Sequence, residues 1–109
     1  MFDNLGCNVI SYDTLPFYAK TVQALSSKRV QVRHWDNKQI KGRFDLLFID
    51  GPAGGENREQ SYKVGSRANA RYIACHDANR KWESKWIDKY LSNRKCVASM
   101  DDNVIKVFE

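Results

Sequence analysis

The 109-residue chain lacks the long apolar run that a membrane-spanning helix requires. Its mean hydropathy is −0.63, and no stretch approaches the roughly 20 apolar residues that cross a bilayer. The first six residues, Met-Phe-Asp-Asn-Leu-Gly, contain neither the basic segment nor the apolar segment of a secretory signal. These absences predict a cytoplasmic protein with no membrane partner.

Cysteine is scarce, and its spacing suits neither disulfides nor a zinc site. Cys7, Cys75 and Cys96 are odd in number and lie far apart, each in apolar surroundings. Disulfide frameworks usually contain an even number of cysteines, and zinc sites usually contain closely spaced pairs. The pattern therefore predicts reduced, buried thiols, as expected in the cytoplasm.

Positive charge is in excess, but it is not concentrated in any one segment. The chain has 18 Lys and Arg against 13 Asp and Glu, which gives a net charge of +5. Such an excess can attract nucleic acid or another anionic partner. No run of five or more basic residues occurs, however, so we favour a solvated surface over a nucleic-acid interface.

The sequence contains an alternation of strand and helix patterns. It shows no internal repeat and no linker, and we therefore expect a single domain over residues 1–109. We expect strands over residues 7–12, 30–35, 44–49, 72–75, 96–100 and 104–108, and helices over 14–25, 59–67 and 79–91. Strands that alternate with helices favour a layered α/β domain. Its sheet should be mostly parallel and should end in an antiparallel hairpin.

The segment 79–91 has the clearest helical pattern in the chain. One side carries the apolar residues Trp82, Trp86, Ile87, Tyr90 and Leu91, and the charged residues are Arg80, Lys81, Glu83, Lys85 and Asp88. We expect the apolar stripe to pack into the core and the charged residues to face solvent.

Polar residues follow two of the apolar runs at the point where each strand should end. Phe44–Ile49 is followed by Asp50–Pro52, and Tyr72–Cys75 is followed by His76–Asp77. Continuous apolar runs suit strands that are buried on both faces, as in a parallel sheet. Ligands of open α/β sheets bind at the carboxyl ends of the strands. The two runs therefore predict a small-molecule site.

Four acids lie at or just beyond expected strand ends: Asp13, Asp36, Asp50 and Asp77. A carboxylate in such a place can bind a ribose diol or an adenine amine, and it can also ligate Mg²⁺ or Ca²⁺. Any one of these residues taken alone is better explained as a helix cap or a turn former. Their recurrence at one edge of the sheet favours a ligand site.

The strand-end motifs together resemble a known family. Ser11-Tyr12-Asp13, Trp35-Asp36, Phe44–Pro52 and Ile73–Asp77 are similar to the successive strand-end motifs of class I S-adenosylmethionine-dependent methyltransferases. The resemblance implies a Rossmann-like, three-layer α/β/α fold with a mostly parallel sheet and a C-terminal antiparallel hairpin. It also implies S-adenosylmethionine as the cofactor and transfer of its methyl group to a small-molecule acceptor that the sequence does not identify.

The same resemblance implies roles for individual residues. Asp13 matches the acid that binds the ribose of the cofactor. Asp36 matches the acid near the adenine amine, with Trp35 as a stacking neighbour. Asp50 and Gly51 match the positions near the methionine end of the cofactor, where a residue can also contact substrate or a metal.

A divalent cation such as Mg²⁺ is a further implication. In the catechol-type branch of the family, the two acids that match Asp50 and Asp77 hold a metal ion, and the second acid is followed by Asn. Here Ala78 follows Asp77. The third ligand is therefore missing unless Asn79 or His76 replaces it.

His76 is the candidate general base, because its ordinary pKa lies near neutrality. It could take the proton of a hydroxyl acceptor, and Asp50 is the alternative proton acceptor. The competing interpretation is a histidine that is held by a backbone carbonyl in a polar loop. Arg58 and Arg80 could bind a carboxylate or phosphate of the acceptor, although we expect both to be solvated.

The start of the sequence departs from the family pattern. The first strand of the family and its glycine-rich loop should precede Cys7, where this sequence has only residues 1–6 and the lone Gly6. We therefore expect a methyltransferase domain or a truncated fragment of one. Either the two halves of the sheet close up against each other, or a partner chain or a second copy completes the sheet. The alternative is a non-catalytic Rossmann-like remnant or binding module.

Overall fold

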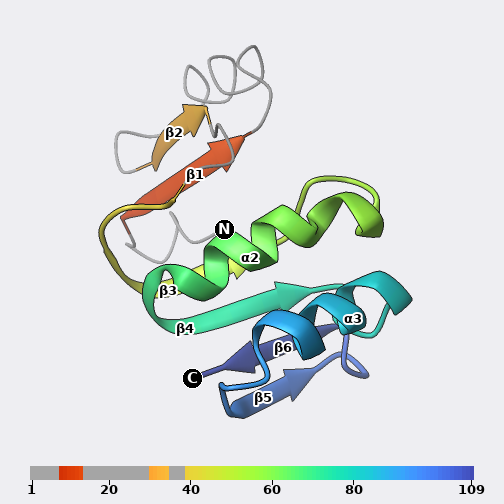
Figure 1. Ribbon diagram of the computed structural model, residues 1–109. Helices are drawn as coiled ribbons and strands as arrows, with labels where there is room; N and C mark the ends of the chain where they lie inside the picture. The colour runs from red at the N-terminus through yellow and green to blue at the C-terminus, as the bar shows by residue number, and fades with distance from the viewer. Residues whose placement is uncertain (1–7, 14–29, 35–38) are drawn as a thin grey trace. The chain divides into compact units, whose positions relative to one another are not determined.

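The computed structural model describes residues 8–13, 30–34 and 39–109 (Figure 1). The chain divides into two compact units, Met1–Lys38 and Gln39–Glu109. In the first unit, strands β1 (Val9–Asp13) and β2 (Val30–His34) form a parallel pair, with Val9 opposite Val30 and Asp13 opposite His34. The helix expected over residues 14–25 lies outside the described residues.

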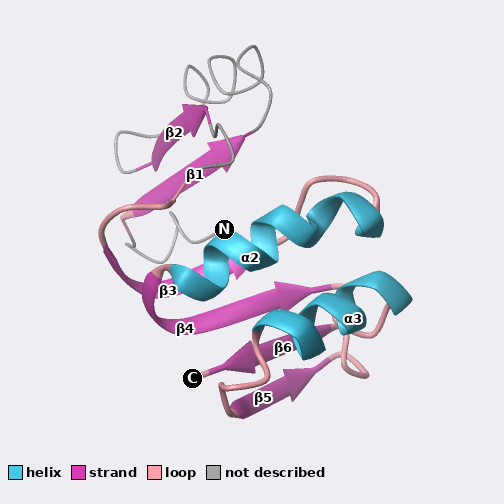
Figure 2. Ribbon diagram, viewed as in Figure 1, coloured by secondary structure: helices cyan, strands magenta, loops and turns pink. Residues whose placement is uncertain are grey.

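The second unit contains a four-stranded sheet and two α-helices (Figure 2). The strands lie in the order β3-β4-β6-β5, with bounds β3 Arg43–Ile49, β4 Asn69–His76, β6 Ile105–Phe108 and β5 Cys96–Met100. The helical segments are the 3₁₀ turn η2 (Gly55–Arg58), α2 (Glu59–Arg67) and α3 (Lys81–Tyr90). These elements confirm the expected strands, helices and terminal hairpin of this half of the chain to within a few residues.

Helices α2 and α3 pack on the same face of this sheet (Figure 1). The sheet contributes Ile49, Ile73, Cys75 and Phe108 to the core, and the helices and the residue that follows them contribute Tyr62, Trp86, Ile87 and Leu91. Gly65 allows α2 to approach closely, because a Cβ atom there would lie 3.1 Å from side-chain carbons of both Leu47 and Ile49. Burial is greatest at the carboxyl ends of β3 and β4, where Ile49, Ile73 and Cys75 pack under the helices. The expectation that the apolar run of β3 is buried on both faces is wrong, because Leu46 is 40% exposed.

The apolar stripe of α3 packs into this core, as its spacing predicts. Trp86, Ile87 and Leu91 are buried, and the rings of Trp82 and Trp86 stack with centroids 5.6 Å apart. One residue of the expected charged side is misassigned: Glu83 is only 2% exposed. It lies three and four residues before Trp86 and Ile87, and helical spacing therefore places it on the buried face.

The expected Rossmann-like, three-layer fold with a mostly parallel sheet is wrong for the described residues. Only β3 and β4 are parallel in the four-stranded sheet, whereas the β4–β6 and β5–β6 pairs are antiparallel. The β1–β2 pair forms a separate two-stranded sheet. The physical reason is the connections: after α3 the chain returns through the hairpin β5–β6, and β6 takes the place beside β4 that a further parallel strand would need. The result is a small mixed sheet.

The cysteine expectation holds for one residue and fails for another. Cys75 and Cys96 are free thiols, but Cys75 is buried in the core while Cys96 is exposed at the start of the edge strand β5. Cys7 lies outside the described residues. No helix in the described part of the chain is long and apolar enough to cross a membrane.

Candidate functional site

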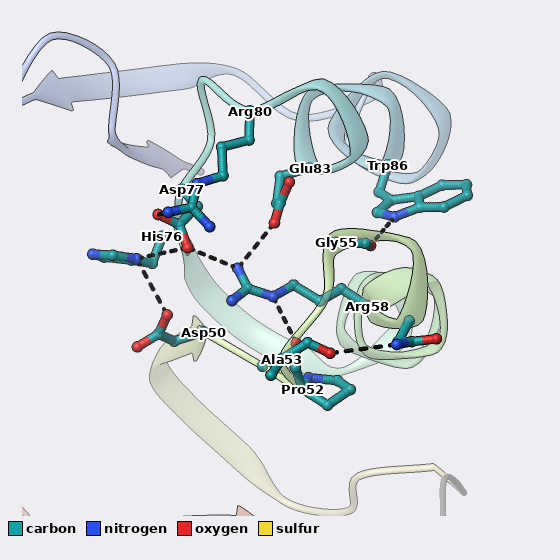
Figure 3. A network of polar contacts seen from close by, with 12 residues as sticks. Asp50, Pro52, Ala53, Gly55, Arg58, His76, Asp77, Arg80, Glu83 and Trp86 are labelled. Atoms are coloured by element: carbon teal, nitrogen blue, oxygen red, sulfur yellow. Dashed lines mark hydrogen bonds and ion pairs between the residues drawn. The ribbon is translucent and has the colours of Figure 1, made fainter.

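The parallel pairing of β3 and β4 brings their polar ends together. Ile49 lies opposite Cys75 in the register, so Asp50 and His76 emerge side by side at one edge of the sheet. Asp77 follows directly (Figure 3). The prediction that these two strand ends deliver polar groups to the same edge is confirmed.

The imidazole of His76 lies between two carboxylates. Its Nδ1 is 3.2 Å from Oδ1 of Asp50 and 3.3 Å from Oδ2 of Asp77. Neither contact has the geometry of a hydrogen bond, and this buried nitrogen has no hydrogen-bond partner among the residues that the structure describes. The ring of Phe48 meets the imidazole edge-on, with centroids 6.4 Å apart. The side chains of Asp50 and His76 remain 51% and 36% exposed, so a ligand can reach them.

Asp77 is the most constrained member of this group. Its backbone has φ of 58°, which is uncommon for a residue with a side chain. Its Oδ2 contacts Nη1 of Arg58 at 3.2 Å, and its Oδ1 contacts Nη2 of Arg80 at 3.3 Å. Burial raises the pKa of Asp77, but the nearby His76, Arg80 and Arg58 outweigh it, and the net pKa lies below the ordinary value. Asp77 is therefore a carboxylate that its neighbours keep ionised.

Arg58 is buried, contrary to the expectation that it would be solvated. Its Nε donates a hydrogen bond to the carbonyl oxygen of Pro52 at 2.8 Å. Its Nη1 contacts both Asp77 and, at 3.2 Å, Oε1 of Glu83. The sequence does contain one indication that a basic residue is buried here. Glu83 lies on the apolar side of its helix, and a buried carboxylate requires a partner. Arg80 is 66% exposed, as expected.

The loop that follows β3 is fixed by hydrogen bonds from both helices. Ser61 in α2 donates to the carbonyl oxygen of Gly51 at 2.8 Å, and Nε1 of Trp86 in α3 donates to that of Gly55 at 2.8 Å. The peptide bond between Gly51 and Pro52 is cis. The backbone beside Asp50 is therefore held on the same helices that cover the core.

The other predicted cofactor residues do not join this group in the described structure. Trp35 and Asp36 lie outside the described residues. Asp13 ends β1 in the first unit, which is described separately from the unit that holds Asp50 and His76. The residues brought together are thus Asp50, Gly51, His76 and Asp77, together with Arg58 and Arg80.

The group also meets the minimal requirement for binding a cation. One ligand atom each from Asp50, His76 and Asp77 lies within 4.8 Å of the others, so His76 supplies the third ligand that the sequence appeared to lack. The fit to a divalent cation is nevertheless poor, because the two oxygens of Asp77 already contact two guanidinium groups. Positive charge at that distance opposes a metal ion and competes for the same lone pairs.

A surface depression of about 430 Å³ lies elsewhere on the second unit, between α2 and α3, and shares no residue with the group above. Two of its charged groups pair with each other: Glu59 accepts hydrogen bonds from Nζ of Lys89 at 2.7 Å and from the hydroxyl of Tyr90 at 2.8 Å. These bonds lower the pKa of Glu59 and raise that of Lys89. We therefore regard the Asp50–His76–Asp77 group as the candidate site.

Comparison with known proteins adds no relative: no protein-family model, no curated protein and no solved structure matches the chain.

Proposed function

We propose that the chain is an S-adenosylmethionine-dependent methyltransferase domain, or a part of one, in which His76 accepts the proton of a hydroxyl group on a small-molecule acceptor. The observation that carries this proposal is the position of the His76 imidazole between two carboxylates at the carboxyl ends of β3 and β4. The resemblance of the motifs to the family is the reason for proposing S-adenosylmethionine as the cofactor. The geometry around His76 supports its role as the base. The proposal does not depend on the three-layer fold.

The two carboxylates favour one tautomer of the neutral His76 ring. Because Asp50 and Asp77 both lie near Nδ1, the neutral ring gains most by keeping its proton on Nδ1, which leaves the lone pair of Nε2 available. In Figure 3 the ring extends away from the Arg58–Glu83 contact. Arg58 and Arg80 hold the Asp77 carboxylate beside Nδ1 of His76, where its negative charge favours a proton on that nitrogen.

When bound, S-adenosylmethionine would supply a sulfonium methyl group for direct displacement by the acceptor oxygen, with S-adenosylhomocysteine as the leaving group. Nε2 of His76 would take the proton that the acceptor hydroxyl loses. Asp50, half exposed beside the ring, orients His76 and is the alternative proton acceptor. The remaining contribution of the protein is to position the donor and the acceptor.

The cofactor contacts proposed from the resemblance are those of Asp13 with the ribose, Asp36 and Trp35 with the adenine, and Asp50 and Gly51 with the methionine end. Calorimetric titration of the full chain with S-adenosylhomocysteine tests them. We expect measurable binding that Asp13→Ala weakens at least about tenfold, the loss of roughly one charged hydrogen bond. Asp88→Ala, an exposed acid on α3, is the control and should bind as the unmodified chain does. No heat at high micromolar ligand would refute the proposal and leave a non-catalytic binding module.

The role of His76 is tested by following the conversion of S-adenosylmethionine to S-adenosylhomocysteine with a panel of hydroxyl-bearing small molecules. Once an acceptor is found, His76→Gln should lower the rate by about 10²- to 10⁴-fold, the usual contribution of a general base. Its affinity for S-adenosylhomocysteine should stay within about twofold of the original, because His76 acts on the acceptor. An unchanged rate in His76→Gln would exclude the histidine as the base.

A divalent cation at Asp50, His76 and Asp77 is the second chemistry that the geometry allows. Titration with Mn²⁺, followed by paramagnetic broadening of the His76 ring signals, distinguishes the two. We expect no saturable broadening below millimolar Mn²⁺, since the guanidinium groups of Arg58 and Arg80 already contact the two carboxylate oxygens of Asp77. Tight, saturable broadening that Asp50→Asn abolishes would instead favour a metal-dependent reaction.

We also propose a cytoplasmic location, supported by the free thiols Cys75 and Cys96. A partner chain or a second copy of this chain as the source of the strand that the family pattern places before Cys7 stays a prediction.

A further inference from the structure

We propose that Arg58 is the positioning residue for His76: it holds the Asp77 carboxylate in place and links the loop after β3 to the loop after β4. The inference rests on the proposed role of His76 as the proton acceptor, but its evidence is the geometry around Arg58. The sequence alone assigned this residue to the surface. The structure places it at the centre of the contacts behind the site (Figure 3).

Arg58 contacts three separate segments of the chain. Nε donates to the Pro52 carbonyl in the loop after β3, and Nη1 lies 3.2 Å from Asp77 after β4 and 3.2 Å from Glu83 in α3. The Arg58 side chain is 8% exposed. These contacts therefore form in a region of low dielectric, where charged hydrogen bonds are stronger than in water.

The contact with Asp77 acts directly on the position of His76. The same oxygen, Oδ2, lies 3.2 Å from Nη1 of Arg58 and 3.3 Å from Nδ1 of His76. Any rotation of the carboxylate that breaks the first contact also changes the second. The backbone of Asp77 is left-handed, with φ of 58°, a conformation that is uncommon for a residue with a side chain and that the surroundings help to hold. Arg58 is well placed to impose it, because its other contacts anchor it to β3 and α3.

The charges explain why the residue must be an arginine. Glu83 is almost completely buried and Asp77 nearly so, and Arg58 lies between them. Its planar guanidinium uses Nε for Pro52 and Nη1 for the two acids, an arrangement that requires two nitrogens in fixed geometry. Lysine has one terminal nitrogen and cannot reproduce both sets of contacts.

The test is the tautomer of His76, read from the ¹⁵N chemical shifts of its ring in the full chain. The chain contains only two histidines, so His34→Gln assigns the signals. In an Asp50→Ala background, Asp77 is the remaining carboxylate at Nδ1, and we expect the neutral ring to keep its proton on Nδ1. Adding Arg58→Met with Glu83→Met removes a buried pair of opposite charges, which proteins often tolerate, and leaves Asp77 with Arg80 as its charged partner. We expect the ring then to shift toward the Nε2-protonated form.

Arg71→Met is the matched control, because Arg71 is also an exposed arginine in an ion pair, but its partner is Glu109 and not Asp77. It should leave the tautomer unchanged. If the double variant does not fold, Arg58→Lys keeps a positive charge between the acids and should shift the tautomer in the same direction. A folded Arg58 variant whose His76 tautomer is unchanged would overturn the inference. The measurement uses no cofactor, so its failure is separate from a failure to bind S-adenosylhomocysteine.

Discussion

Cys75 and Cys96 show how strongly the environment of a single residue decides its chemistry. Cys75 is fully buried between β3, α2 and α3, and burial raises the pKa of its thiol to about 12 although the neighbouring Tyr62 hydroxyl lowers it. Cys96 is exposed on the edge strand. Because the thiolate is the reactive species, the two side chains should differ greatly in reactivity.

Alkylation measures this difference. In a Cys7→Ser background at pH 8, iodoacetamide should modify Cys96 at least about 100-fold faster than Cys75, because Cys75 has to be exposed by unfolding before it ionises. Intact-mass spectrometry follows the reaction, and Cys96→Ser should remove the fast phase. Addition of denaturant should make both thiols reactive. Fast modification of Cys75 in the native chain would contradict the packing of the core.

The burial of Arg58 and Glu83 was not predicted from the sequence. A charged residue is usually solvated, and nothing in the local pattern around Arg58 signals burial. Only the contact between two loops and α3, which are distant in the sequence, places a guanidinium between two acids. His76 is the opposite case, since its place at the end of an apolar run was sufficient to locate it.

At the scale of elements, the 3₁₀ turn η2 packs closely against α3 at Gly55. A Cβ atom at Gly55 would lie 2.7 Å from Cβ of Trp82 and 2.9 Å from Oε2 of Glu83, whereas one at Gly51 would meet nothing within 4 Å. Gly55→Ala should therefore separate η2 from α3 and destabilise the fold by about 1–3 kcal/mol, as overpacking usually does.

Chemical denaturation followed by tryptophan fluorescence tests this prediction, because Trp86 donates its hydrogen bond to Gly55. Gly51→Ala serves as the matched control and should change the unfolding free energy by less than about 0.5 kcal/mol. Equal changes in unfolding free energy for Gly55→Ala and Gly51→Ala would show that the close approach of Trp82 and Glu83 does not prevent a side chain at position 55.

Elements in the second unit were predictable because their patterns are strong and local. The apolar run of β3, the stripe of α3 and the Asp-Asp-Asn turn of the β5–β6 hairpin each specify one structure. Apart from the terminal hairpin, the pairing of the strands was not predictable. Pairing depends on long-range contacts, and the sequence pattern of β6 does not show that it takes the place beside β4.

For the molecule as a whole, the candidate site and the stability of the fold share one ionised group, Asp77. Its pKa in the folded chain lies below the ordinary value, with burial opposed by His76, Arg80 and Arg58. Asp77 therefore gives up its proton more readily in the folded than in the unfolded chain. Its contribution to stability is present above the ordinary aspartate pKa of about 3.9 and is lost as the pH falls below that value.

This linkage predicts how Asp77→Asn changes the pH dependence of unfolding. At pH 7 the variant should be less stable by about 1–3 kcal/mol, because Arg58 loses a charged partner in a buried place. Between pH 5 and pH 3 the variant should lose less stability than the original chain, since asparagine has no proton to gain. Denaturant titrations at a series of pH values measure both effects, and Asp88→Asn, on the exposed side of α3, should follow the original curve. Parallel curves for Asp77→Asn and the original chain would mean that Asp77 is not held ionised by the arginines, and the orientation of His76 would then need another cause.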